Sequence, residues 1–483
     1  MYLKVGLEVH TQLASLRKLF SPSRTSFGAY QNSQVSYFDA ALPGTQPKFN
    51  WECLHLALRA AVALNCSVAP VCSFDRKHYM YPDQPCGYQI TQFYQPYAKG
   101  GYLDLFPRDF TTKGTQDQRI RLKQIQIEQD TGKSFHVDGS TLIDLNRCNT
   151  PLIELVTEPD FRSADSAAVF VRKLQTLLRH LGVTTGSMET GAMRVDVNVS
   201  AHSDGYDGPR CEIKNLFSTA AVKSAIKYEF NRQVKDIKAG KTIHSETRGW
   251  DGKKTFTLRD KEGSIDYRYM PDPEIAEIII PSTIVSQISA QMPDLPDVIL
   301  QSLLEPPYNL SIVDARILLD FGMDHVRFYK EAYETFVRSG GRSPHIVHKW
   351  LIQRWLGRTE ILPNKNLFND LLLAVDQNKI TSATGKMIVN HLTDPTNVTT
   401  SEVPPPCLDE LIKEYGLEGR TEDQSLLDLC QQVIEANPDV VERIRAGKKS
   451  SIQFLLGEVI KQSMGTYPPN KVKEALERLV SEN

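Results

Sequence analysis

The chain has 483 residues, enough for two to four domains with substantial hydrophobic cores. Hydrophobic residues make up 41% of it and charged residues 24%, and the formal net charge of −2 means that a polyanion would have to bind a local basic patch. The eight cysteines are scattered without a CxxC pair, which argues against a zinc ribbon and favours a reducing compartment. No apolar run approaches the ~20 residues that cross a bilayer, and Met1 runs almost directly into the first predicted strand. We therefore expect a soluble, intracellular protein that has no membrane partner.

Alternating apolar and polar residues mark the first predicted strand, between residues 4 and 13. In it Val5, Leu7 and Val9 alternate with Glu8 and His10. Side chains two residues apart lie on the same face of a strand, so this segment has one apolar and one polar face. The pattern recurs in later segments, whose polar or terminal positions hold Glu128, Glu154, Arg194, Asp196, Asn198, Glu212 and Lys214.

Acidic residues in so many strand-like segments predict a binding site. Asp and Glu are poor strand formers, so another pressure has placed them there. If these strands share one sheet, its open face carries clustered carboxylates that need cations, and metal-bound phosphate is one way to supply them. The alternative interpretation is an antiparallel sheet with one ordinary solvated face.

Farther along, the chain changes from mixed strands and helices to helices alone. A helix is predicted from Ser163, which can cap it, to Gly182, which can end it. The prolines of MPDLPDV indicate a domain boundary, and those of SEVPPP a stiff linker. We predict an α+β domain over residues 1–292, a helical domain over 293–403 and a small helical tail domain over 407–483.

Neither common phosphate-binding loop occurs in the chain, which has no GxxxxGK[ST] and no GxGxxG after a strand. If ATP is used, carboxylates on the strands must hold it through metal ions, while Arg and Lys neutralise its oxygens. The candidate cations are Arg76, Lys77, Arg194, Lys214, Arg259 and Lys261. Taken singly, each is more typical of a solvated surface charge, but as a set they point to a phosphate site.

Several long motifs, in order, resemble the B-type subunit of the tRNA-dependent amidotransferases. They are GLEVHTQL, RKHYMYPDQPCGYQITQ, DLNRCNTPLIELVTEPDFRS, GSMETGAMRVDVNVS, RCEIKNL and DYRYMPDPE. This family converts Glu-tRNA(Gln) to Gln-tRNA(Gln), and in many lineages also Asp-tRNA(Asn) to Asn-tRNA(Asn). The resemblance covers the first predicted domain closely and extends more loosely to AGKKSSIQFLLGEVIKQSMG in the tail.

The resemblance implies a cradle domain with a largely antiparallel sheet, related to the glutamine synthetase and guanido kinase fold. Such a cradle binds ATP and Mg²⁺, phosphorylates the side-chain carboxylate of the misacylated amino acid and exposes the acyl phosphate to ammonia. The implied catalytic and metal-site residues are Glu8, His10, Glu128 and Glu154. Because magnesium prefers oxygen ligands, His10 is nearly as compatible with hydrogen bonding to a ligand as with direct ligation. Weaker ATP- and phosphate-binding assignments are Arg76, Lys77, Arg194, Asp196, Asn198, Glu212, Lys214, Arg259 and Lys261.

Two departures from bacterial relatives qualify the resemblance. The segment from Ser36 to Gly44 reads SYFDAALPG where bacterial relatives carry a cysteine-containing segment, so a cysteine metal site is lost there. Where many relatives read EED, this chain reads EQD from Glu128, which makes Glu128 the expected essential residue of the pair. The segment FDRKHYMYPDQPCGYQ is closer to mitochondrial, particularly fungal, forms. We therefore expect the mitochondrial matrix, with the bacterial cytoplasm as the alternative.

The resemblance also implies partners. Nothing in the chain resembles an amidase active site, so glutamine hydrolysis should belong to a partner amidase (glutaminase) subunit that supplies ammonia. A small third subunit is expected to brace the pair, and misacylated tRNA is the expected substrate. Two alternatives remain: a tRNA-binding scaffold without catalysis, and a free-standing ATP-dependent carboxylate–amine ligase, which leaves the tail unexplained.

The tail is basic. Between Arg443 and Glu482 it carries eight Lys and Arg against four Asp and Glu. From charge alone, a solvated basic helix face is the more common interpretation, but the family's tail domain is thought to meet the body of the tRNA. The tRNA-binding candidates are Arg443, Arg445, Lys448, Lys449 and Lys461.

Overall fold

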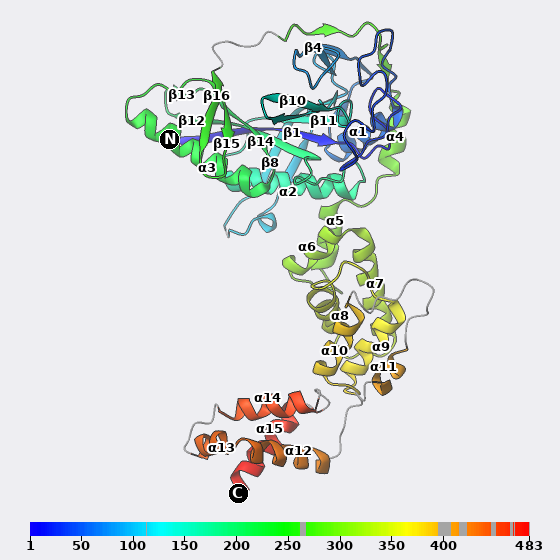
Figure 1. Cartoon of the computed structure of the whole chain (residues 1–483), viewed down its shortest axis with the longest axis vertical. Coiled ribbons are helices and arrows are strands. Elements are labelled where there is room, and N and C mark those ends of the chain that lie inside the picture. Colours follow the sequence, from blue (N-terminus) through cyan, green and yellow to red (C-terminus); the bar gives the residue numbers. More distant parts are fainter. Residues whose placement is uncertain are drawn as a thin grey trace. The chain divides into compact units, whose positions relative to one another are not determined.

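The computed structural model describes residues 1–112, 114–260, 267–394, 407–414, 423–445, 451–463, 467 and 469–482. The chain forms two compact units, Met1–Ile299 and Leu300–Asn483, which we describe separately (Figure 1). The first unit is mixed α+β, and the second is helical, as the sequence predicts. Within the described part of the chain, no helix has the length and apolar character needed to cross a membrane.

A large sheet dominates the first unit. It has 11 strands, and β1 (Tyr2–Gln12) lies between β11 (Pro151–Thr157) and β12 (Met193–Ser203), antiparallel to both. Its main order is β16-β15-β14-β12-β1-β11-β8-β6-β2, and of these pairs only β14 with β15 is parallel. The other strands of this sheet are β2 (Ser67–Val68), β6 (Ala98–Lys99), β7 (Tyr102–Leu105), β8 (Gln118–Gln129), β13 (Tyr206–Asp207), β14 (Cys211–Leu216), β15 (Glu246–Trp250) and β16 (Thr255–Asp260).

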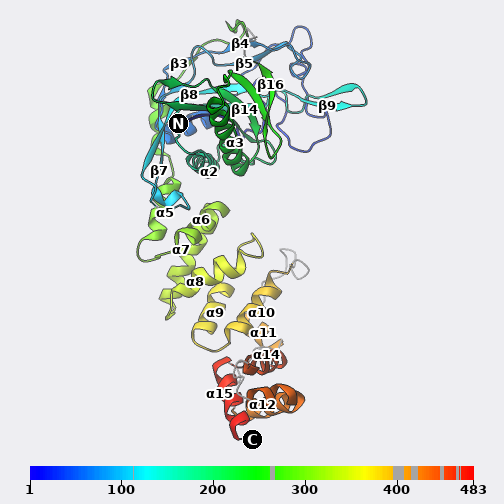
Figure 2. The ribbon, with the colours of Figure 1, turned by 90° about the vertical axis from the view of Figure 1, so that its left-hand side faces the viewer.

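One face of this sheet is apolar and is covered by helices. Val5, Leu7 and Val9 of β1 are buried in the main hydrophobic core. The helices α2 (Ala164–His180) and α3 (Thr219–Lys238) pack side by side against this face, as Figures 1 and 2 show. The predicted start of α2 is confirmed, because the side chain of Ser163 accepts a hydrogen bond from the amide of Ser166. The opposite face of the sheet is therefore left for polar side chains.

Smaller sheets and helices complete the first unit. The three-stranded sheet β17-β4-β5 places β4 (Asp75–His78) between β17 (Met270–Pro271) and β5 (Tyr88–Thr91). The aromatic rings of Phe93 and Tyr269 stack there with their centroids 3.8 Å apart. The remaining elements are α1 (Trp51–Ala63), β3 (Val71–Cys72), η1 (Pro107–Asp109), β9 (Lys133–Val137), β10 (Ser140–Asp144), β18 (Ile278–Ile279) and α4 (Ser282–Ala290).

A fully buried ion pair joins Lys18 to Asp39, which lies in the segment that departs from the cysteine-containing pattern. The side chains of Lys18 and Asp39 are both 0% exposed, and their charged atoms are 3.0 Å apart. The ammonium of Lys18 also donates to the carbonyl of Leu145, while Asp39 accepts from the amide of Ser36 and from the side chain of Asn149. This hydrogen bonding compensates for the removal of both charges from water.

The second unit is built from short helices. In its first part these are α6 (Ile312–Phe321), α7 (Met323–Arg338), α8 (His345–Trp350), the π-helix η3 (Leu351–Trp355), α9 (Lys365–Asp376), α10 (Ser382–Leu392) and α11 (Leu408–Glu414), and α5 (Pro296–Leu304) spans the boundary between the units. The helices nearest the C-terminus are α12 (Asp423–Ala436), α13 (Pro438–Arg445), α14 (Ile452–Gln462) and α15 (Pro469–Glu482). These last four share a hydrophobic core of their own, which includes Cys430, Val441, Leu455 and Leu476. The predicted linker SEVPPP lies outside the described residues, and the three-domain division stays a prediction.

Candidate functional site

The polar face of the large sheet gathers side chains from distant parts of the sequence. In the strand register, His10 lies opposite Glu154 on one side and Arg194 on the other, and Glu8 lies opposite Asp196. Asn198 of β12 pairs in turn with Glu212 of β14. The alternation along each strand therefore puts the predicted metal-site residues next to one another, on one face.

The first group consists of His10, Glu128 and Glu154. One possible ligand atom from each lies within 4.8 Å of the others. The Nδ1 of His10 is 3.1 Å from Oε1 of Glu128, and its Nε2 is 4.0 Å from a carboxylate oxygen of Asp196. The imidazole ring thus bridges two carboxylates and fixes the side chain of Glu128.

Excess negative charge shapes the protonation of this group. Burial lowers the pKa of His10, but the carboxylates of Glu154, Glu128 and Asp196 outweigh it and raise that pKa to about 9. Burial and the charge of Glu128 raise the pKa of Glu154 to about 8. The pKa of Glu128 is lowered despite its burial, because His10, Lys77 and Arg194 favour its charged form. Without a metal ion the group holds protons at neutral pH, and a divalent cation would compete with them for the same oxygens.

The second group consists of Glu8, Asp196 and Glu212, whose possible ligand atoms also lie within 4.8 Å of one another. Here the ammonium of Lys214 lies 3.0 Å from Asp196 and 2.9 Å from Glu212. Burial lowers the pKa of Lys214, but the two carboxylates outweigh burial and raise it. Because Lys214 already neutralises part of the negative charge of this second group, a metal ion is needed less here than in the first group.

An amide with an unsatisfied oxygen lies beside Glu8. The Nδ2 of Asn198 donates to Oε1 of Glu8 at 3.0 Å, whereas its buried Oδ1 has no hydrogen-bond partner among the residues that the structure describes. Both residues line a cavity of about 430 Å³ that also contains Lys4 and Lys123. Buried polar atoms are rarely left without partners, so this oxygen suits a ligand or a ligand-bound water. Carboxylates, an amide oxygen and nearby cations are the donor set expected for Mg²⁺ with phosphate, so the residues present fit that group.

The other predicted cations lie in different surroundings. Arg194 donates to Asp130 at 2.9 Å, and its charge reaches Glu128. Arg76 instead pairs with Asp272 at 2.7 Å and with Glu274 at 3.1 Å, which ties β4 to the segment DYRYMPDPE.

Lys77 lies 4.6 Å over the ring of Tyr267. Its charge contributes to the lowered pKa of Glu128 and opposes the rise in the pKa of Glu154 that burial and Glu128 cause. Arg259 lies on β16, in register with Thr247, but its side chain and the whole of Lys261 lie outside the described residues.

Sequence reasoning missed three residues that contact or face the first group. Gln126 donates to Glu154 at 2.7 Å, and Thr91 donates to Glu128 at 3.3 Å. The pKa of Tyr269 is raised by burial and by the charges of Glu154 and Glu128, which places the phenol close to both. Gln126 could have been found, since it lies two residues before Glu128 on the same strand face. Thr91 and Tyr269 lie on short segments without a comparable pattern.

The tail candidates are only partly described. Arg443 is an exposed residue of α13, and Lys461 belongs to α14, with its ammonium 4.0 Å from Glu458. Arg445 is the last residue of α13, and its side chain lies outside the described residues, as do Lys448 and Lys449. Whether this surface binds tRNA stays a prediction.

The site thus belongs to a mixed α+β unit that carries carboxylate groups and cations on one sheet face and is followed by a helical unit. The chain belongs to the GatB family: the model described as GatB/GatE catalytic domain matches residues 3–286, and the model described as GatB domain matches residues 333–480. Three similar proteins are each named as the B-type subunit of a mitochondrial glutamyl-tRNA(Gln) amidotransferase. The one from Scheffersomyces stipitis is 44% identical over 99% of this chain and 95% of its own length. Those from Candida tropicalis and Lachancea thermotolerans are 42% and 41% identical, over 98% and 99% of this chain and 95% and 93% of their own lengths.

Proposed function

We propose that the chain is the catalytic GatB subunit of a mitochondrial glutamyl-tRNA(Gln) amidotransferase, which converts Glu-tRNA(Gln) to Gln-tRNA(Gln) with ATP. The observation that carries the proposal is the pairing of two carboxylate groups on one sheet face, in a chain that the family's two models match over residues 3–286 and 333–480. We further propose that the first unit is a cradle of the glutamine synthetase and guanido kinase type. We also propose the domain division that the resemblance implies, in which the cradle covers residues 1–292, the helical domain 293–403 and the tail domain 407–483.

The chemistry needs an activated carboxylate. The side-chain carboxylate of the glutamyl group attacks the γ-phosphorus of ATP, so that an acyl phosphate forms and ADP leaves. Ammonia then attacks the acyl carbon, the C–O bond to phosphate breaks, and the amide and inorganic phosphate are released, with one proton of the ammonia passing to the phosphate. When bound, Mg²⁺ would neutralise phosphate oxygens during the first step.

The side chains divide this work. Glu8, Glu128 and Glu154 would hold Mg²⁺, and His10 either joins them or keeps Glu128 oriented through its 3.1 Å hydrogen bond. Lys77, Lys214 and Arg194 supply positive charge beside the carboxylates and the phosphates. Asp196, Asn198 and Glu212 orient Lys214 and Glu8. Arg76 holds the segment that carries Tyr269 near the group.

The first expected result concerns the division of labour between subunits. Purified alone, the chain should not hydrolyse glutamine, because the proposal assigns ammonia production to an amidase partner. In the complex with that partner and a small bracing subunit, it should use either glutamine or free ammonia with misacylated tRNA. The measurement is release of glutamate from glutamine, with and without the partners.

Glutamine hydrolysis by the isolated polypeptide would contradict this proposal. The scaffold alternative is tested in parallel by ATP-dependent phosphate release with Glu-tRNA(Gln) in the complex. A complex that binds this tRNA but releases no phosphate would identify the chain as a scaffold. Phosphate release with a small carboxylic acid in place of the tRNA would indicate a free-standing ligase.

The second expected result concerns the tail as a tRNA-binding surface. Removing residues from 407 onward should weaken tRNA binding and flatten its salt dependence, because each lost phosphate contact no longer displaces counterions. ATP binding by the cradle should be unchanged. Filter binding of tRNA over a salt series measures both quantities, and unchanged affinity and slope in the truncated complex would show that the tail does not hold the tRNA.

A further inference from the structure

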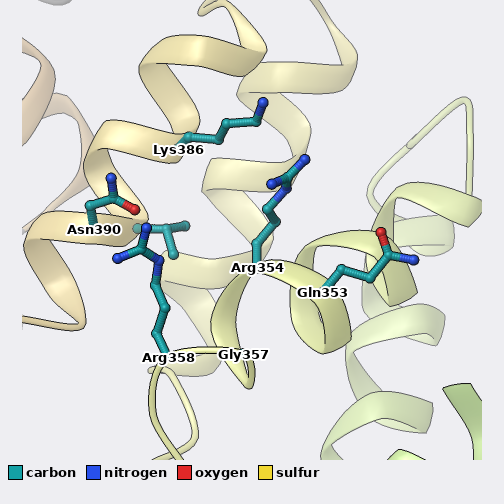
Figure 3. A pocket seen from close by; sticks show the side chains of 7 residues that line it. Gln353, Arg354, Gly357, Arg358, Lys386 and Asn390 are labelled. Atoms are coloured by element: carbon teal, nitrogen blue, oxygen red, sulfur yellow. The ribbon is translucent and has the colours of Figure 1, made fainter.

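A cationic pocket lies in the helical unit. Its residues are far along the chain from both carboxylate groups. Its volume is about 440 Å³, and it is bounded by η3, the turn that follows η3, and α10. Its lining consists of Gln353, Arg354, Gly357, Arg358, Lys386, Val389 and Asn390 (Figure 3). This lining therefore offers three cations and two amides and has no acidic residue.

The three cations of the pocket differ from neighbouring cations in their ion pairing. Within the part of the chain that the structure describes, no ion pair joins Arg354, Arg358 or Lys386 to an acid. By contrast, Arg338 pairs with Glu334, and Lys365 with Glu331. Arg354 is also partly buried, where an uncompensated charge is more costly than at the surface. A bound anion would compensate for all three.

General basicity of the helical unit does not explain the pocket. Residues 301–394 carry 11 Lys and Arg against 10 Asp and Glu, so this part of the chain is almost neutral. Three of its cations nevertheless line one cavity. Figure 3 shows the side chains of Arg354 and Lys386 extending toward the same side, and the guanidinium of Arg358 beside Asn390.

Local backbone features set up this arrangement. Arg354 lies on a π-helical turn, a rare geometry that is frequent at functional sites. Lys386 follows Gly385, where an added Cβ would lie 2.5 Å from the ring of Trp350. Only glycine allows α10 to approach the Trp350 side chain this closely, and that approach places Lys386 and Asn390 on the same cavity as Arg354 and Arg358.

We propose that this pocket binds a phosphate group of the tRNA backbone, which gives the helical unit a phosphate contact separate from the basic tail. This inference rests on the proposed function, which supplies tRNA as the substrate. Arg and Lys are the usual partners of phosphate, and the amides of Gln353 and Asn390 can donate further hydrogen bonds. Contacts of this kind position a nucleic acid without reading its sequence. The pocket therefore recognises tRNA by its backbone, not by its identity.

The test uses the complete complex and replaces two exposed pocket cations with neutral residues, in the double variant Arg358→Gln with Lys386→Gln. At about 0.1 M salt we expect a loss of roughly tenfold in tRNA affinity, and a salt slope lower by about one per lost contact. The matched control is Arg342→Gln with Lys379→Gln, which removes the same charge from exposed positions of the same unit outside the pocket. The variant Lys386→Arg should keep near-normal affinity, because it keeps the charge. Thermal unfolding of each complex shows that the fold is intact.

Each outcome decides the proposal. Unchanged tRNA affinity in the pocket variant, or an equal loss in the matched control, overturns it. Loss of ATP or inorganic phosphate binding with intact tRNA binding also overturns it, because the pocket would then hold a small free anion. Failure of the proposed function is a separate result, seen as a wild-type complex that does not amidate Glu-tRNA(Gln). Direct binding of tRNA still tests the pocket in that case.

Discussion

The substitution Glu154→Gln should reduce ATP-dependent transamidation by the assembled complex roughly 100-fold or more while leaving the fold intact. The change removes a carboxyl group that can ionise when it binds Mg²⁺, from the group formed with His10 and Glu128. The carboxyl has a pKa of about 8 because burial and Glu128 disfavour its charge, so at neutral pH the folded protein already holds it mostly uncharged. Glutamine has nearly the same shape as that protonated carboxyl, and its oxygen can still accept from Gln126. Mg²⁺-dependent phosphate release and thermal unfolding measure the two effects.

A matched control for this experiment is Glu277→Gln, which makes the same chemical change at an exposed position far along the chain from β11. It should leave both activity and stability unchanged. If a folded Glu154→Gln complex transamidates at a near-normal rate, Glu154 is not part of the metal site. If it fails to fold, the loss of activity says nothing about metal binding, and the same substitution at Glu128 takes its place as the test.

Glu128 and Gln129 should respond in opposite ways, although they are neighbours. Glu128→Gln should abolish the Mg²⁺-dependent step with little change in stability, since Glu128 contributes an oxygen to the carboxylate group. Gln129→Ala should instead lower the free energy of unfolding by about 1–3 kcal/mol, because it leaves the buried amide of Ile90 without its 2.7 Å hydrogen-bond acceptor. Gln129 also accepts a hydrogen bond from the side chain of Gln84, so its side chain links β8 to two other segments of the first unit.

Urea unfolding and Mg²⁺ titration of both variants separate these effects. The distinction tests the alignment of β8, since strand alternation puts adjacent residues on opposite faces. An essential Gln129 together with a dispensable Glu128 would show that the functional face of this strand has been assigned wrongly. Gln129→Glu is a poorer probe, because it would bury a new charge.

Period-two patterning was sufficient to predict which residues lie on the polar face of the large sheet. The alternation in β1 and β12 fixed which side chains share a face, and the register then put Glu8 opposite Asp196 and His10 opposite Glu154. The start of α2 was equally predictable, because a serine cap and an amphipathic stripe are local signals.

Contacts between distant segments could not be predicted in this way. Arg76 pairs with Asp272, 196 residues later, while its contact with phosphate stays a prediction. Likewise, a lysine two residues after Glu212 gives no sign that its ammonium will bridge two carboxylates. The cationic pocket of the helical unit was missed entirely, because Arg354, Arg358 and Lys386 become neighbours only when α10 packs beside η3. Such features depend on tertiary packing between distant segments, and no periodic pattern in the sequence indicates which segments will pack together.

The buried pair of Lys18 and Asp39 has a consequence for anyone who redesigns this chain. Replacing either residue alone leaves the other charge unpaired at a site with 0% exposure, which lowers the free energy of unfolding by about 3–5 kcal/mol. Replacing both with apolar residues of similar volume costs far less. The two positions are therefore expected to change together during evolution. A sequence in which position 39 has changed and position 18 has not would encode a less stable protein.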